Sequence, residues 1–136
     1  MACPLFIPCS PLGELVSIAP PLGDLYGGEC EADRTAVIEP EILRRYCNFG
    51  YARGICERSA IADADAVRLL VKADTAGDAG RSIELAWALE RNHLPVAVGT
   101  MEIRADAAAA AEDPLSRQAF ACVAAYLRQS HSASKQ

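Results

Sequence analysis

The stretch Ile83-Glu84-Leu85-Ala86-Trp87-Ala88-Leu89-Glu90 sets the fold class of this chain. Its large apolar side chains occupy every second position, and such alternation is typical of a β-strand with one buried face. Similar alternation predicts a strand before it, at residues 67–72, and another after it, at residues 96–103. A loop at 74–80 and a turn at 91–95 would connect them, and short connections indicate an antiparallel meander.

A helix is expected to follow the sheet and to cover one of its faces. Asp113 is a typical N-cap, and Pro114 suits the first helical position. Apolar side chains recur at spacings of three and four after it: Leu115, Ala119, Cys122, Val123 and Tyr126. Such a stripe packs on an apolar sheet face. The predicted fold class is therefore α+β, a three-stranded antiparallel meander packed by a C-terminal helix.

The chain is expected to form one compact domain with two unlike parts. Residues 61–129 hold the sheet and its helix, and residues 130–136 form a polar, disordered tail. Five of the eight prolines lie within the first 21 residues, and proline lacks the N–H that a central strand needs. Residues 1–60 are therefore predicted to be an irregular Pro- and Cys-rich metal-binding segment. It contains one short helix, from Pro40 to Cys47.

Charge and cysteine content narrow the classes of function. A net charge of −5 makes nucleic acid an unlikely partner, because nucleic-acid-binding domains present a basic surface. No run of about 18 apolar residues is present, so no membrane span is expected. The first residues lack the features of an export signal, which predicts a cytoplasmic protein with reduced thiols. Six reduced cysteines are typical of metal ligands or reactive groups.

Three cysteines are the strongest candidates for metal ligands. Cys30, Cys47 and Cys56 are each isolated in the sequence and follow or bracket glycines. Cys3 is the preferred fourth ligand, because the apolar residues after it would seal a site from water. Cys9 competes with Cys3 for that place.

The residues around these cysteines suit a negatively charged metal site. Four thiolates around Zn²⁺ or an oxidised cubane carry a formal charge of about −2, which needs compensation when buried. Residues 34–58 contain five arginines and three glutamates in a chain that is otherwise acidic. We expect Arg45 and Arg53 to face the cofactor. Gly50 and Gly54 would let the main chain approach a sulfur closely.

The spacing favours a [4Fe–4S] cluster over Zn²⁺. Structural zinc sites usually use paired cysteines two to four residues apart, and none occur here. Compact iron–sulfur runs are absent too, but a cubane spreads its four iron corners over a larger volume and accepts single cysteines from separate segments. Aromatic residues near the cysteines would shield an oxidisable cluster: Phe6, Tyr26, Tyr46, Phe49 and Tyr51. The cluster would serve a structural, electron-transfer or redox-sensing role.

Other interpretations stay open at this point. A structural-zinc interaction module fits the same cysteines. An enzyme with Cys56 or Cys47 as nucleophile would need His93 as its imidazole partner, and this is less favoured than a non-catalytic role. The partner is an unidentified protein or redox partner, and the oligomeric state is undetermined. Cys122 and Trp87 are assigned to the core.

Overall fold

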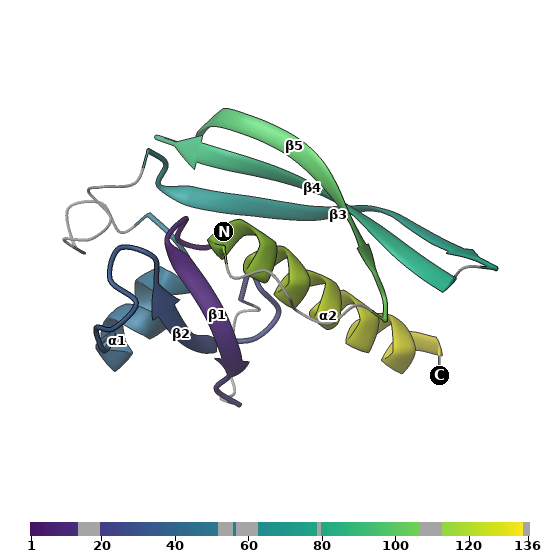
Figure 1. Ribbon diagram of the computed structural model, residues 1–136, viewed down its shortest axis with the longest axis horizontal. Helices are drawn as coiled ribbons and strands as arrows, with labels where there is room; N and C mark the ends of the chain where they lie inside the picture. Colours follow the sequence, from purple (N-terminus) through teal and green to yellow (C-terminus); the bar gives the residue numbers. More distant parts are fainter. Residues whose placement is uncertain (14–19, 52–55, 57–62, 79, 107–112, 135–136) are drawn as a thin grey trace.

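The structure is a computed structural model of the whole chain, and it describes residues 1–13, 20–51, 56, 63–78, 80–106 and 113–134. It contains a three-stranded sheet, a two-stranded sheet and one long helix (Figure 1). The long helix lies along one face of the larger sheet, and the smaller sheet lies at one end of the molecule. The fold class is α+β, as the sequence predicts.

The larger sheet is the predicted antiparallel meander. Its strands are β3 (Ala66–Gly77), β4 (Gly80–Arg91) and β5 (Leu94–Arg104), in that order. The two central rows pair Leu69 with Trp87 and Gly99, and Val71 with Leu85 and Met101. The β4–β5 turn consists of Asn92 and His93, with φ of 53° and 66°. Two left-handed residues are typical of the turn that suits the twist of a hairpin.

The loop expected at residues 74–80 is shorter than predicted, which corrects the sequence analysis. β3 continues to Gly77 and β4 begins at Gly80, so Asp74 pairs with Ile83. A bulge at Lys72 separates this outer part of the hairpin from the central rows. Because a bulge shifts which side chains share a face, Asp74 comes to lie on the helix side of the sheet, where Tyr126 contacts it.

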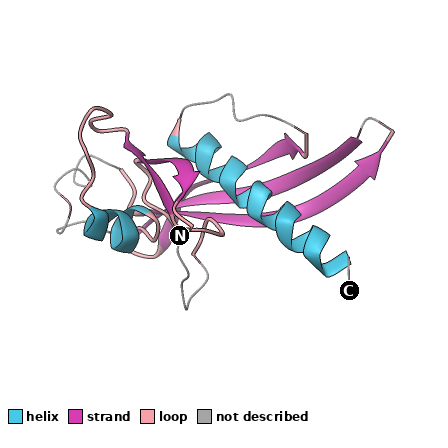
Figure 2. Cartoon of the chain, turned by 90° about the horizontal axis from the view of Figure 1, so that it is seen from below, coloured by secondary structure: helices cyan, strands magenta, loops and turns pink. Residues whose placement is uncertain are grey.

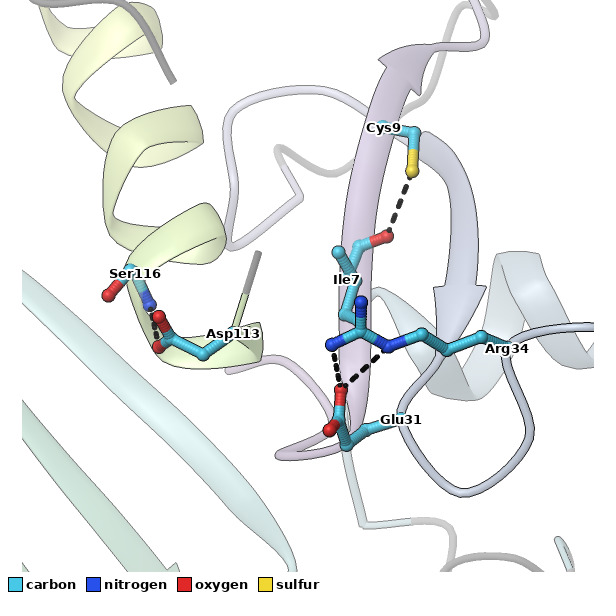
Figure 3. A network of polar contacts seen from close by, with 6 residues as sticks. All are labelled: Ile7, Cys9, Glu31, Arg34, Asp113 and Ser116. Atoms are coloured by element: carbon cyan, nitrogen blue, oxygen red, sulfur yellow. Dashed lines mark hydrogen bonds and ion pairs between the residues drawn. The ribbon is translucent and has the colours of Figure 1, made fainter. Parts of the chain in front are cut away.

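The helix α2 (Pro114–Ser134) packs on the sheet as predicted (Figure 2). Asp113 caps it, since the Ser116 N–H donates to its Oδ2 at 2.9 Å (Figure 3). The buried core between helix and sheet consists of Ile83, Leu85, Ala119 and Val123. The helix extends through Ser134, into the stretch 130–136 that was expected to be disordered.

Trp87 is only partly buried, although the sequence assigns it to the core. Its indole lies against Gly99 of the neighbouring strand, where an added Cβ would fall 2.5 Å from Trp87 Cζ2. Gly99 therefore leaves room for the indole ring on the sheet. The buried core beneath α2 does not include Trp87.

The N-terminal part is more regular than expected, because it contains a β-hairpin. β1 (Phe6–Pro11) pairs antiparallel with β2 (Tyr26–Cys30). In a two-stranded sheet both strands are edge strands, and edge strands tolerate prolines such as Pro8. A bulge occurs at Cys9, and an added Cβ on the facing Gly28 would lie 2.0 Å from the Ile7 carbonyl oxygen. Gly28 thus allows the two main chains to approach.

The predicted short helix is present as an α-helical turn followed by a π-helical turn. α1 (Pro40–Ile42) continues into η1 (Leu43–Cys47), which is wound as a π-helix. Such wide turns are rare and often occur at functional sites. Here the wide turn ends at Cys47.

The two parts of the chain are joined through α2 and β3. Ala2 forms an antiparallel bridge with Val67, so the first residues lie along the edge of β3. A second core cluster consists of Ala2, Phe6, Leu22, Tyr26 and Ala121, and the last of these belongs to α2. One helix therefore contributes to both cores.

Candidate functional site

The segments that carry Cys3, Cys30 and Cys47 meet beside the second core cluster. The Cys3 N–H donates to the Cys47 carbonyl oxygen at 3.1 Å. The Phe6 N–H donates to the Cys3 carbonyl oxygen at 3.0 Å, and Phe6 pairs with Cys30 in the hairpin. Cys3 and Cys47 both pack against the second core cluster, which contains Phe6 and Tyr26. Three of the predicted ligands are thus held close together by main-chain contacts.

Cys30 and Cys56 also act on the Cys3 thiol through their charge. Burial is the largest cause that raises the pKa of the Cys3 thiol to about 11, and the negative charges of the ionised Cys30 and Cys56 thiols contribute to that value. That the four sulfurs converge on one metal stays a prediction.

The other two cysteines lie elsewhere. Cys9 is exposed on β1, and its thiol contacts the Ile7 carbonyl oxygen at 3.5 Å (Figure 3). Cys122 lies on α2 and packs against the core of the meander. Cys122 thus packs at the core position assigned to it. The choice of Cys3 over Cys9 as fourth ligand stays a prediction.

The structure does not show a preformed metal cage. Within the described residues, no three side chains of Cys, His, Asp or Glu are arranged as a metal-binding group. Metal ligation requires thiolates, so binding would release protons and draw the sulfurs inward.

Asn48 fixes the position of Cys47, and the sequence analysis missed this role. Its side chain is fully buried directly after Cys47. Its Oδ1 accepts from the Tyr26 N–H at 2.9 Å, and its Nδ2 donates to the carbonyl oxygens of Tyr26 and Leu43 at 3.1 and 2.8 Å. The end of η1 is thereby fastened to β2, the strand that ends at Cys30.

Gln118 does the same for Cys3, from the opposite end of the chain. It is fully buried on α2, and its Nε2 donates to the carbonyl oxygens of Cys3 and Phe6 at 2.7 and 2.8 Å. Its Oε1 has no hydrogen-bond partner among the described residues. A buried acceptor left unpaired costs about 1–3 kcal/mol. The two donated bonds, which close the turn from Cys3 to Phe6, must offset that cost.

Gly50 brings the chain after Cys47 against the residue next to Cys3. Its φ is +81°, and an added Cβ would lie 2.9 Å from Ala66 Cβ and 3.2 Å from the Ala2 carbonyl oxygen. The sequence analysis expected this glycine to let the main chain approach a sulfur. In the structure its contact is with the main chain of Ala2 and with β3.

Of the remaining predicted cofactor contacts, the structure describes only Arg45. Arg45 is exposed and forms an ion pair with Glu41 at 2.6 Å on the surface of the short helix. Arg53 and Gly54 lie outside the described residues. Compensation of charge at the site by arginine therefore stays a prediction.

A second polar group fastens the chain after Gly50 to the meander. Tyr51 has a φ of 57° and stacks on His93, with ring centroids 4.3 Å apart. Its hydroxyl donates to Glu90 Oε1 at 3.0 Å, and Arg68 donates to the other carboxylate oxygen at 2.8 Å. His93, the imidazole considered for a cysteine nucleophile, is thus stacked in a hairpin turn.

Comparisons with known proteins add no identification to this geometry. No family model, no curated protein and no solved structure matches the chain. Among the described residues, no helix combines the length and apolar character that crossing a bilayer requires.

Proposed function

We propose that this chain is a small cytoplasmic metal-binding protein in which Cys3, Cys30, Cys47 and Cys56 ligate a [4Fe–4S] cluster. The main-chain bond between Cys3 and Cys47, beside the hairpin that carries Cys30, is the observation that supports it most. All six cysteines are free of disulfides, which fits a reducing compartment. The cluster would have a structural, electron-transfer or redox-sensing role with a protein or redox partner.

The origin of the ligands favours a cubane over a single Zn²⁺ ion. Cys3 precedes β1, Cys30 ends β2 and Cys47 ends η1, so each comes from a separate element. A cubane accepts single ligands at spaced corners, whereas structural zinc sites mostly use paired cysteines. Cys3 and Cys47 pack against the buried cluster that contains Phe6 and Tyr26, and apolar surroundings protect a cluster from water and oxidants.

A catalytic cysteine is less well supported. An enzyme nucleophile needs a thiol whose pKa is lowered by a nearby cation or base. The candidates for a nucleophile are Cys56 and Cys47, and the imidazole that either would need is His93, which is stacked on Tyr51 in the β4–β5 turn.

The test is anaerobic purification followed by reconstitution with ferrous iron and sulfide. We expect a brown protein with broad absorbance near about 400 nm and about four iron and four sulfide ions per chain. A colourless protein that holds one Zn²⁺ would instead support the zinc module. A chain that takes up neither iron nor zinc would refute the proposal.

Matched cysteine variants assign the ligands. Cys47→Ser should lose the metal, and Cys3→Ser should lose it as well. Cys122→Ser and Cys9→Ser are the controls, because Cys122 packs in the meander core and Cys9 is exposed on β1. Loss of metal in Cys9→Ser with retention in Cys3→Ser would show that the fourth ligand is wrongly assigned.

A further inference from the structure

Two buried amides hold the main chain at the cysteine site from different directions. Asn48 connects the end of η1, at Cys47, to β2, which ends at Cys30. Gln118 connects α2 to the turn that carries Cys3. Neither side chain is exposed to solvent, so water does not compete for these hydrogen bonds.

We infer that Asn48 and Gln118 are the positioning residues of the metal site, and that they hold three of its ligands in place before the metal binds. This inference rests on the proposed function. The two amides donate or accept five hydrogen bonds in all, each to a main-chain atom in or beside a ligand-bearing segment. None of these bonds involves a sulfur, so none has to be broken when a metal enters.

The arrangement has a consequence for how the metal is exchanged. Cys3 is also bonded to Cys47 through the main chain, and Cys30 is fixed by its pairing with Phe6. The inference therefore predicts that side-chain rotations, without a rearrangement of the main chain, bring these sulfurs onto a cluster. The metal would enter and leave a folded protein, which suits a site that responds to the supply of iron or to oxidants.

Side-chain variants test the positioning role directly. Gln118→Met keeps the length of the side chain and removes both donors, and Asn48→Leu removes all three of its bonds. Gln129→Met, at an exposed position of the same helix, is the matched control. In iron-loaded protein that is still folded by circular dichroism, we expect Gln118→Met and Asn48→Leu to lose iron to a chelator at least tenfold faster than wild type. Loss of outer contacts typically weakens a metal site by 10- to 100-fold.

A spectroscopic readout separates positioning from general stability. The reduction potential and the electron paramagnetic resonance spectrum of the reduced cluster should shift in the two variants and stay unchanged in Gln129→Met. A merely structural role would lower the melting temperature and leave the spectrum of the folded molecules as in wild type. Folded variants with wild-type chelation rates and spectra would overturn the inference.

Hydrogen exchange of the wild-type chain tests it even if the variants do not fold. The Cys3 amide is bonded to Cys47, and the Tyr26 amide is bonded to Asn48. Both should remain protected in metal-free protein, within tenfold of the metal-loaded form. Exchange at the rate of an unfolded chain without metal would show that the metal assembles the site, and would refute the inference while metal uptake stands. Failure to take up any metal would instead refute the proposed function.

Discussion

Gly50 shows how a single residue without a side chain joins the site to the sheet. Its left-handed backbone carries the chain from Cys47 toward Tyr51, and its Cα lies against Ala66 of β3. A side chain here would meet two separate obstacles. One is the unfavourable φ, and the other is the contact with Ala66 and Ala2.

Gly50→Ala should therefore destabilise the protein by about 2–5 kcal/mol. A left-handed non-glycine residue costs roughly 1–2 kcal/mol, and overpacking adds about 1–3 kcal/mol. Gly13→Ala is the control, because Gly13 has a φ of +72° and nothing within 4 Å of an added Cβ. It should lose about 1 kcal/mol. Urea unfolding of both variants measures the difference, and equal losses would mean that the contact with Ala66 is loose.

At the scale of elements, a polar cluster closes the far end of the helix–sheet interface. The Tyr126 hydroxyl donates to Asp74 Oδ2 at 2.8 Å, and Arg81 donates to the other oxygen at 2.8 Å. The Arg81 guanidinium also lies 5.9 Å from the centroid of the Tyr126 ring, a distance at which cation–π attraction operates. β3, β4 and α2 each contribute one residue to the cluster.

This cluster predicts a dependence of stability on acid. Hydrogen bonds from Arg81 and Tyr126 lower the pKa of Asp74 to about 2 from an ordinary value of 3.8. A lowered pKa in the folded state stabilises the protein above about pH 4, and this stabilisation is lost as the pH falls toward 2. Asp74→Asn should be less stable than wild type at pH 7, and the difference should shrink between pH 4 and 2.

Thermal unfolding at a series of pH values measures this difference. Asp106→Asn is a suitable control, since that carboxylate is exposed on the surface. A difference between wild type and Asp74→Asn that stays constant down to pH 2 would contradict the role given to Asp74.

The elements that the sequence predicts correctly are those with a regular pattern. Alternation around Ile83 and Leu85 suffices for the meander, because these two side chains are fully buried on one face of β4. The hairpin β1–β2 has no such signal, since Pro8 and Pro11 disfavour a strand and only the absence of a third strand makes them acceptable. The bulge at Lys72, which places Asp74 on the helix side of the sheet, has no comparable signal in the sequence.

At the scale of the whole molecule, α2 makes the N-terminal part and the meander depend on one another. Gln118 and Arg117 donate to carbonyl oxygens of Cys3 and Pro8, and Arg128 pairs with Asp24. The sequence analysis predicts that residues 1–60 form an irregular metal-binding segment. The structure adds a hairpin and a shared helix that hold this segment without one.

Metal-free protein should therefore unfold in a single step. Trp87 fluorescence reports on the meander, and the reactivity of the Cys3 and Cys47 thiols reports on the N-terminal part. We expect both to change at the same urea concentration, which is the mark of one cooperative unit. The exposed thiol of Cys9 should react at all concentrations and serves as the internal reference.

Unfolding of the metal-free protein in two steps would contradict this prediction. Thiols of Cys3 and Cys47 that react well before Trp87 is affected would show that the N-terminal part opens independently when the metal is absent. That result would favour a metal that is required for the structure of residues 1–60.

The cysteines of the candidate site could be predicted, but the residues that hold them could not. Cys30, Cys47 and Cys56 stand out by their number and their glycine neighbours. Asn48 and Gln118 look like ordinary polar residues, and their partners lie 22 and up to 115 positions away in the sequence. A buried amide becomes recognisable only when the fold shows which main-chain groups it satisfies.

The long-range clamp by Gln118 also sets the order of events during synthesis. A ribosome adds about 5–20 residues per second and releases the N-terminal segment first. The hydrogen bond from Gln118 to the Cys3 carbonyl oxygen can form only after Gln118, 115 residues later in the chain, has been synthesised. Contacts between residues that are far apart in the sequence also form slowly. The cysteine thiols of the nascent chain are therefore exposed to solvent for several seconds, before the fold can cover them. Loading of the metal would belong to the finished, released protein, and a cell that makes this chain must keep those thiols reduced until its last helix is complete.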